Sequence, residues 1–208
     1  MVQAEQASTV VFGERLSIAE QYAEILSSVG VERGLLGPRE VPRIWDRHLL
    51  NCVVLQELVE RGARVVDVGS GAGLPGIPLA IARPDLLVTL VEPLLRRASF
   101  LQQVVDTLGL DVAVYRGRAE DRATQSTVGS ADVIAARAVA PLGKLMGWCL
   151  PLARAGGRVL AIKGDSAAEE LARDRLSIRR LGGQYLQVRQ CGADLLATPT
   201  TVVEAARG

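Results

Sequence analysis

A glycine-rich turn between an apolar run and a helix start constrains the fold of this chain more than any other feature. Residues 64–82 read RVVDVGSGAGLPGIPLAIA, with Gly69, Gly71 and Gly73 directly after the apolar run. In an α/β sheet such a turn lies at the carboxyl end of a strand, where ligands bind. Glycine lets the backbone approach a ligand closely and adopt positive φ angles. The turn therefore predicts an α/β fold that holds a cofactor at residues 67–73.

The chain beyond Gly62 has the pattern of a parallel sheet. Short apolar runs alternate with helical stretches, which is typical of a sheet covered on both faces. We expect strands near 64–68, 87–91, 112–115, 133–136 and 158–163, and helices near 76–82, 94–108, 141–150 and 167–181. The runs 185–191 and 200–205 are candidates for a closing antiparallel pair, and Trp148 is expected in the core.

The residues before this sheet are expected to form a helical extension. Apolar residues recur at helical spacing over 16–29 and 45–59, while 30–42 carries three glycines and two prolines and is expected to be a loop. A chain of 208 residues with 49% hydrophobic residues fits one core. We therefore predict an N-terminal helical extension at 1–61 and an α/β domain at 62–208, packed as one unit.

Composition excludes several classes of protein. No apolar run approaches the roughly 20 residues that cross a bilayer, and the N-terminus lacks a signal pattern, so we expect a cytoplasmic protein without a membrane partner. The cysteines Cys52, Cys149 and Cys191 are too widely spaced for a metal site or a disulfide framework and are expected to be buried thiols. A net charge of +1 gives no overall sign of nucleic-acid binding, so contact with RNA would depend on a local basic patch. A monomer is the default expectation.

The glycine turn alone leaves two cofactors open. The G-x-G-x-x-G pattern at 71–76 also fits a dinucleotide such as NAD. Asp67 ends the strand, and if its carboxylate points into the cavity it would repel a pyrophosphate and attract the ammonium group of S-adenosylmethionine. Glu92 ends the next strand, where an acidic side chain can bind ribose hydroxyls of either cofactor. Asp67 favours S-adenosylmethionine; the structural alternatives are a turn-capping Asp67 and a solvated Glu92.

Several further segments complete a resemblance to one family. The glycine turn continues as GLPGIPLAIARPD and is followed in order by VEP with LLRRASFLQQV, RGRAED, ADVIAARAVAPL and GGRVLAIKG, all between about residues 41 and 164. With these segments the chain resembles the RsmG (GidB) family, the 16S ribosomal RNA guanine-N7 methyltransferases. The element DRHLLN also resembles the family's RHxxDS-type element, whereas VERGLLGPREV replaces its asparagine-rich segment.

The resemblance implies a fold, a cofactor and a site. The fold is an α/β, Rossmann-like S-adenosylmethionine-dependent methyltransferase sheet with an N-terminal helical extension, and the substrate is 16S rRNA or the small ribosomal subunit. Carried over by position, the cofactor contacts are Gly69, Leu74, Glu92, Ala119, Glu120 and Arg137. A small residue with an exposed backbone N–H beside an acidic one can frame the adenine edge, which suits Ala119 and Glu120.

Three basic residues are expected around the cofactor mouth. Arg137 follows the fourth strand and could bind the cofactor's carboxylate, the guanine O6 or a phosphate. Its structural alternative is an ion pair with Asp132 or Asp67. Lys163 ends the fifth strand on the same sheet edge, and with Arg118 it would complete a basic rim suited to the RNA backbone. We therefore predict that Arg137 and Lys163 are the catalytic residues.

The sole histidine lies in the extension. His48 is either a packed helix residue or, together with Arg47, a contact to RNA. With Arg118 and Lys163, these two residues complete the predicted RNA-binding set.

The predicted chemistry requires no general base. Guanine N7 carries a lone pair and no proton, so in-line methyl transfer depends on positioning and on a water-poor site. Two alternatives stay open at this point. One is a nicotinamide-dependent oxidoreductase, which would lack a Tyr-Lys proton donor near the fourth strand. The other is a non-catalytic ribosome-binding assembly factor.

Overall fold

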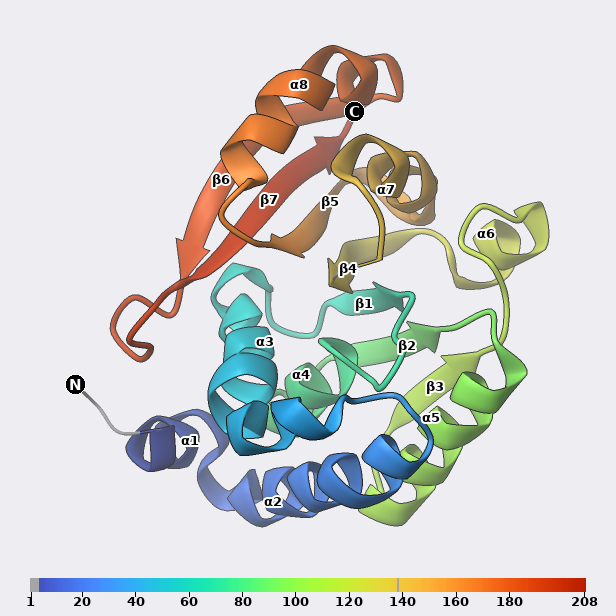
Figure 1. Ribbon diagram of the computed structural model, residues 1–208. Coiled ribbons are helices and arrows are strands. Elements are labelled where there is room, and N and C mark those ends of the chain that lie inside the picture. The colour runs from blue at the N-terminus through green and yellow to red at the C-terminus, as the bar shows by residue number, and fades with distance from the viewer. Residues whose placement is uncertain (1–3, 138) are drawn as a thin grey trace.

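The computed structural model describes residues 4–137 and 139–208, and these form a seven-stranded sheet flanked by helices (Figure 1). The strands are β1 (Arg64–Val68), β2 (Leu87–Val91), β3 (Val112–Tyr115), β4 (Ala131–Arg137), β5 (Ala153–Lys163), β6 (Gly183–Cys191) and β7 (Thr200–Arg207). Their order is β3-β2-β1-β4-β5-β7-β6, with β7 antiparallel to both neighbours. The chain runs outward from β1 in both directions, and such a reversal of strand order is where α/β sheets bind ligands.

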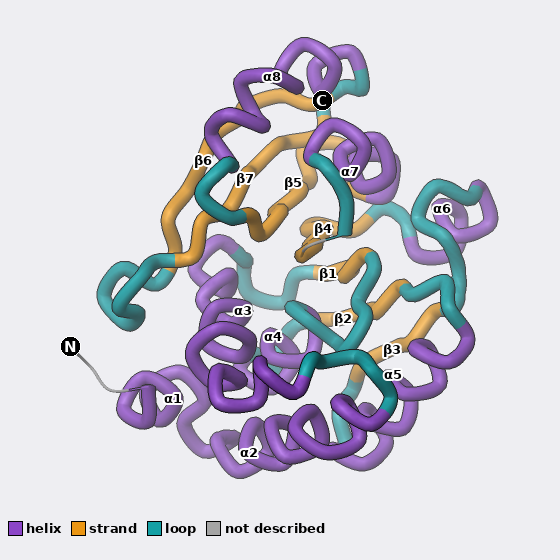
Figure 2. The backbone as a smooth tube through the Cα atoms, in the orientation of Figure 1, coloured by secondary structure: helices purple, strands orange, loops and turns teal. Residues whose placement is uncertain are grey.

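Helices cover both faces of the sheet (Figure 2). They are α4 (Gly76–Ala82), α5 (Leu95–Leu108), α6 (Arg122–Val128), α7 (Leu142–Cys149) and α8 (Ala167–Arg180), with a short 3-10 helix η6 (Leu150–Leu152). Strand residues alternate between the faces. Val65 packs with α4 and α5, whereas Val66 packs with α7 and α8.

The N-terminal extension, from α1 to η5, packs on the α4 and α5 face (Figure 1). Its elements are α1 (Ala4–Phe12), η1 (Gly13–Arg15), α2 (Leu16–Ile25), η2 (Leu26–Gly30), η3 (Pro38–Arg43), η4 (Ile44–Leu50), α3 (Asn51–Val53) and η5 (Val54–Leu58). Buried residues of the extension, such as Tyr22 and Leu49, belong to the same hydrophobic cluster as Ile77 of α4 and Leu101 of α5. The extension therefore shares a core with the sheet.

The structure confirms the five predicted parallel strands and the closing antiparallel pair. Two helices were not predicted, α1 and α6; the sequence of α6, RATQSTV, has no apolar stripe to signal a helix. The predicted loop at 30–42 is wrong at both ends. Gly30 ends the π-helix η2 and residues 31–32 are helical, while Pro38 starts a 3-10 helix because its fixed φ suits a first helical turn. The predicted helix at 45–59 is helical but divides into π, α and 3-10 segments.

Candidate functional site

The glycine turn after β1 has the backbone conformation that its sequence predicts. Gly69, Gly71 and Gly73 have φ angles of +70°, +58° and +103°. The N–H of Gly69 donates to the carbonyl of Val91 at 2.8 Å, which ties the turn to the end of β2. A Cβ on Gly73 would lie 3.0 Å from the hydroxyl of Tyr22, so α2 packs directly against the turn. The turn is thus held by both the sheet and the extension.

A cavity of about 360 Å³ opens beside this turn at the carboxyl ends of the central strands. Its volume lies within the roughly 300–1,000 Å³ range of ligand pockets. It brings together residues that follow four different strands: Gly69 after β1, Glu92 after β2, Arg118, Ala119 and Glu120 after β3, and Val139 after β4. Of the predicted cofactor residues, Gly69, Glu92, Ala119 and Glu120 therefore line one cavity.

Glu92 is fixed at the floor of this cavity by two backbone donors. Its Oε2 atom accepts a hydrogen bond from the N–H of Gly71 at 3.0 Å, and its Oε1 atom accepts one from the N–H of Leu94 at 3.0 Å. The residue is 2% exposed, so the alternative of a solvated carboxylate is wrong. Each carboxylate oxygen can accept more than one hydrogen bond, which leaves capacity for the two hydroxyls of a ribose.

Asp67 lies beneath the turn and not in the cavity. Its side chain is 0% exposed, and its Oδ2 atom accepts a hydrogen bond from the N–H of Gly76 at 3.0 Å. Burial raises the pKa of this carboxyl to about 7, although the Gly76 hydrogen bond lowers it. The prediction that the carboxylate points into the cofactor cavity is therefore corrected: Asp67 braces the turn from the side of α4, close to the turn-capping alternative.

The remaining turn residue, Leu74, packs against the shared core. Its N–H donates to the carbonyl of Ser70 at 3.1 Å, and its half-buried side chain contacts the cluster formed by the extension, α4 and α5. Leu74, Gly71 and Gly73 shape the turn; they are not among the residues that surround the 360 Å³ cavity.

Arg137 ends β4 on the other side of the turn, where it meets the extension. One terminal nitrogen, Nη2, lies 3.0 Å from Nδ1 of His48, and the other, Nη1, donates to Sγ of Cys52 at 3.0 Å. The Nε2 atom of His48 lies 2.9 Å from Oε2 of Glu40. Within the described residues Arg137 has no acidic ion-pair partner, and Asp132 pairs with Arg154 instead at 2.6 Å. The alternative of an ion pair with Asp132 or Asp67 is thus wrong.

His48 does not reach solvent as a contact to RNA would require. The residue is 7% exposed, and both ring nitrogens face protein partners. The expectation of a direct RNA contact through His48 is corrected for this reason. Arg47, its neighbour in η4, has a half-exposed side chain and lies 3.5 Å from a carboxylate oxygen of Glu40.

Lys163 and Arg118 do not form one rim. The Lys163 ammonium pairs with Glu170 of α8 at 2.8 Å and donates to the carbonyl of Ala140 at 3.1 Å. It therefore ties the loop after β4 to α8, beside a separate surface hollow. Arg118 is at the cavity mouth with 63% of its side chain exposed, 3.6 Å from Glu120. The predicted shared rim is corrected because the two side chains lie at different hollows.

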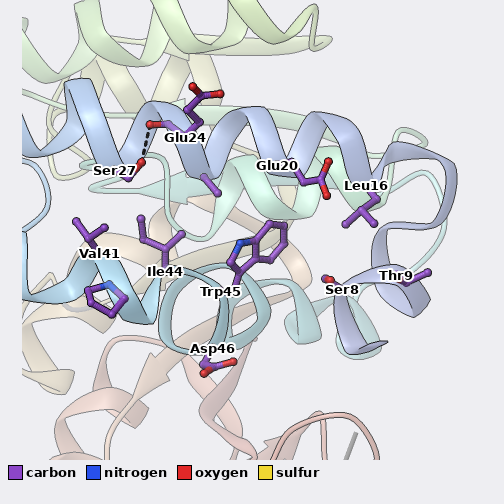
Figure 3. Close-up of a pocket in the computed structure, with 12 residues that line it drawn as sticks. Ser8, Thr9, Leu16, Glu20, Glu24, Ser27, Val41, Ile44, Trp45 and Asp46 are labelled. Carbon is purple, nitrogen blue, oxygen red and sulfur yellow. Dashed lines mark hydrogen bonds between the residues drawn. The ribbon is translucent and has the colours of Figure 1, made fainter. Parts of the chain in front are cut away.

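A larger groove of about 710 Å³ lies in the extension, away from the strand ends. Figure 3 shows Trp45 and Ile44 facing the α2 helix across it, with Glu20 and Glu24 on α2 and Asp46 on η4. Carboxylates repel the phosphates of RNA. None of the predicted site residues lines this groove, so the cavity beside the glycine turn is the candidate site.

Sequence reasoning missed several residues at or near the site, among them Trp148, Val139, Glu40 and Cys52. Trp148 and Val139 line the cavity, although Trp148 was expected in the core, while Glu40 and Cys52 meet the His48–Arg137 pair. Of these, only Val139 could have been found from the sequence, because it follows the buried fourth strand at the sheet edge where ligands bind. The other three come close through tertiary packing.

Two absences hold for the part of the chain that the structure describes. No three His, Cys, Asp or Glu side chains there come together as a metal site. The three cysteines are free and buried, and their burial agrees with the prediction. Among the same residues, no helix has the length and apolarity that crossing a bilayer demands.

Solved methyltransferase structures share this fold. SibL, a S-adenosylmethionine-dependent methyltransferase in its apo form, superposes with a TM-score of 0.61 at 19% identity, covering 80% of this chain and 57% of that one. Fibrillarin from Aeropyrum pernix with natively bound S-adenosyl-L-methionine gives 0.54 at 20% identity, covering 75% and 73%. The sheet order and the cavity at its strand ends define the Rossmann-like fold that these methyltransferases share. More narrowly, the chain belongs to the GidB family, rRNA small subunit methyltransferase G, which matches residues 15–197.

Relatives of the same name match nearly the whole chain. The Ribosomal RNA small subunit methyltransferase G of Rhodococcus jostii is 62% identical over 201 residues, covering 97% of this chain and 88% of the relative. That of Mycolicibacterium gilvum is 59% identical over 197 residues, covering 95% and 87%. The family settles the choice between the two cofactors, and the nicotinamide alternative is wrong.

The residues of the cavity fit S-adenosylmethionine. A Cβ on Gly69 would lie 2.9 Å from Cγ1 of Val139, so only glycine keeps the backbone of the turn open at this point. Glu92 offers a fixed carboxylate of the kind that binds a ribose diol.

Proposed function

We propose that this chain transfers a methyl group from S-adenosylmethionine to N7 of a guanine in 16S rRNA, acting as a cytoplasmic enzyme. The family fixes a methyltransferase of small-subunit rRNA. The observation that carries the finer assignment is Arg137, a half-buried guanidinium without an acidic partner in the described chain, placed beside the glycine turn. Arginine at a base-binding site commonly binds the O6 edge of guanine.

Cofactor binding is proposed to use the cavity described above. Glu92 would hold the ribose hydroxyls, while Ala119 and Glu120 would frame the adenine. The turn residues Gly69, Gly71, Gly73 and Leu74 would give the backbone its close approach, with Asp67 bracing the turn from below. When bound, S-adenosylmethionine supplies a methyl group on a positively charged sulfonium.

The chain's own residues would act by positioning. Guanine N7 has a free lone pair, so no side chain needs to remove a proton before the methyl group is transferred. Arg137 would donate to the guanine O6 or to the cofactor's carboxylate, which aligns the two reactants. Trp148 and Val139 line the cavity and would exclude water from around the reactants, which would strengthen the interactions of charged groups inside it.

Contacts to RNA are proposed for Arg118 and Arg47. Both side chains are about half or more exposed and can reach phosphates, which set affinity and register without reading sequence. Lys163, which is held by Glu170, is proposed to act through the loop that precedes α7.

Isotope labelling tests the proposal. The enzyme is incubated with methyl-labelled S-adenosylmethionine and with small subunits, free 16S rRNA or tRNA, and the digested nucleosides are separated by mass spectrometry. Label in 7-methylguanosine of 16S rRNA, lost in an Arg137→Ala variant, supports the proposal. Label in another nucleoside would refute the N7 assignment, and no label in any RNA would favour a ribosome-binding assembly factor.

A further inference from the structure

The two ring nitrogens of His48 connect the N-terminal extension to the end of β4. Glu40 of η3 contacts Nε2 at 2.9 Å, and Arg137 of β4 contacts Nδ1 at 3.0 Å. The second terminal nitrogen of Arg137 meets Cys52 of α3. Every partner of the guanidinium within the described residues therefore comes from the extension, and no residue of the sheet domain holds it.

This arrangement defines the protonation state of His48. Arg137 can only donate, because a guanidinium has five N–H donors and no acceptor. The Nδ1 atom of His48 must therefore be the bare, accepting nitrogen, and the single proton of a neutral imidazole must be on Nε2. The carboxylate of Glu40 accepts that proton's hydrogen bond. Glu40 thus selects the tautomer that can hold Arg137.

The charges around His48 favour this neutral form. Burial lowers the pKa of His48 most, and the positive charges of Arg137 and of Arg47 in η4 lower it further, while Glu40 opposes them. The hydrogen bond from His48 keeps the pKa of Glu40 below its ordinary value. On the far side of Arg137 lie Cys52 of α3, a thiol whose pKa burial raises, and beyond it two buried groups, Tyr22 of α2 and Asp67 of β1.

We propose that His48 and Glu40 are positioning residues for methyl transfer: neutral His48, held by Glu40, fixes the guanidinium of Arg137 on the extension side of the glycine turn, outside the wall of the 360 Å³ cavity. This inference rests on the proposed role of Arg137. It makes the extension part of the reaction site, because η3 and η4 supply the groups that aim a side chain of the sheet. Two of the five guanidinium donors are used by His48 and Cys52, and the others have no partner among residues 4–137 and 139–208, which leaves them for a carboxylate or a guanine.

Two substitutions of His48 distinguish its contact with Arg137 from its contact with Glu40. In His48→Asn the amide oxygen can take the place of Nδ1 and still accept from Arg137. In His48→Gln the amide nitrogen can take the place of Nε2 and still donate to Glu40, but the Arg137 contact is lost. We expect His48→Gln to reduce kcat/KM by about tenfold or more, the loss typical of a hydrogen bond to a charged group, and His48→Asn to reduce it far less.

A pH profile distinguishes positioning from a merely structural role. Protonation of His48 would place an N–H against the donors of Arg137, so wild-type activity should fall as the pH drops through a value below the ordinary pKa of histidine, about 6.5. The His48→Asn variant should lack this fall. Glu40→Gln removes the charge that supports protonation, so its fall in activity should move to lower pH. Asp67, whose pKa burial raises to about 7, is unchanged in all of these variants, so its effect on the profiles should cancel in the comparison.

The control is Asp46→Asn, an exposed position on the same helix η4, which should leave kcat/KM and the melting temperature unchanged. A second measurement needs no substrate: nitrogen NMR of the ring of His48 should show the Nε2–H tautomer at neutral pH. An Nδ1–H tautomer, or a charged ring at that pH, would overturn the inference.

The two proposals fail in different ways. Equal activity of His48→Gln, His48→Asn and wild type, with Arg137→Ala inactive, would overturn the positioning role and leave the proposed function standing. Full activity of Arg137→Ala would instead remove the role of Arg137 in the proposed function.

Discussion

The carboxylate of Asp67, at the end of β1, accepts a hydrogen bond from the backbone N–H of Gly76 at 3.0 Å, across the whole glycine turn. Its second oxygen, Oδ1, is buried without a hydrogen-bond partner among the described residues. An unpartnered buried oxygen destabilises the ionised form, because a buried charge needs hydrogen bonds on all sides. The raised pKa of about 7 reflects this burial.

The first prediction concerns stability against pH. Folding raises the pKa of Asp67, so the folded protein favours the protonated carboxyl. The contribution of Asp67 to the free energy of unfolding is therefore fully present below the unfolded-state pKa of about 4 and is lost as the pH rises through about 7. Asp67→Asn cannot titrate, and its oxygen can still accept from Gly76. The free energy of unfolding of Asp67→Asn minus that of wild type should therefore increase between pH 5 and pH 8, by about 2 kcal/mol or more.

Urea denaturation at the two pH values measures this difference. Asp111→Asn, which changes an exposed carboxylate before β3, should show the same difference from wild type at both. Asp67→Asn showing a pH-independent difference would mean that Asp67 is ionised without strain in the folded protein.

The second prediction concerns Glu92. In Glu92→Gln one oxygen becomes an amide nitrogen, which cannot accept from the N–H of Gly71 or Leu94 and offers ribose one acceptor fewer. We expect the affinity for S-adenosylhomocysteine to fall by about tenfold or more, as hydrogen bonds to a charged group typically contribute. Isothermal titration calorimetry measures it. An unchanged affinity in Glu92→Gln would place the ribose elsewhere.

The third prediction concerns Gly69 and the loop after β4. The methyl group introduced by Gly69→Ala would lie 2.9 Å and 3.0 Å from the two γ carbons of Val139, at a φ of +70°. The left-handed backbone costs roughly 1–2 kcal/mol for a non-glycine residue, and the contact adds to it. Binding of S-adenosylhomocysteine should weaken, and adding Val139→Ala should restore part of the loss. Val139→Ala alone is the control. If the double variant binds S-adenosylhomocysteine no more tightly than Gly69→Ala does, backbone strain alone accounts for the weaker binding.

The sequence was sufficient for the central sheet and for part of the site. Uninterrupted apolar runs such as 64–68 and 87–91 are specific to strands buried on both faces, and the ends of parallel strands meet at one edge. Gly69 and Glu92 could therefore be placed at one cavity without a structure, whereas Ala119 was predicted through the resemblance to the family. The polar helix α6 could not be predicted, because its seven residues lack an apolar stripe and one of its two buried residues, Thr124, is polar.

The orientation of site residues was harder to predict. Asp67 lies on the same face of β1 as Val65, toward α4, and a strand buried on both faces carries no polar alternation to reveal this. His48 and Arg137 are 89 residues apart in the chain, and nothing local in either segment indicates their contact. Contacts of this kind depend on how the extension docks onto the sheet.

The last prediction concerns Lys163, whose ammonium lies 2.8 Å from Glu170 with both side chains largely buried. Lys163→Met removes the cation and leaves the carboxylate with the backbone N–H of Leu142 as its main partner. The free energy of unfolding at pH 7 should fall by about 1–3 kcal/mol, the cost of leaving a buried charged group short of a partner. Adding Glu170→Gln should recover part of it.

The pH dependence of this loss has a definite sign. Lys163 holds the pKa of Glu170 below its ordinary value, so the stabilisation is present above that ordinary value and is lost as the pH falls through the folded-state pKa. The difference between wild type and Lys163→Met should therefore shrink in acid, which urea denaturation at pH 7 and pH 3 can measure. In methylation assays Lys163→Met should lose less activity than Arg137→Ala, because its ammonium is engaged by α8. A larger loss of activity, with unchanged stability, would mean that Lys163 takes a direct part in catalysis.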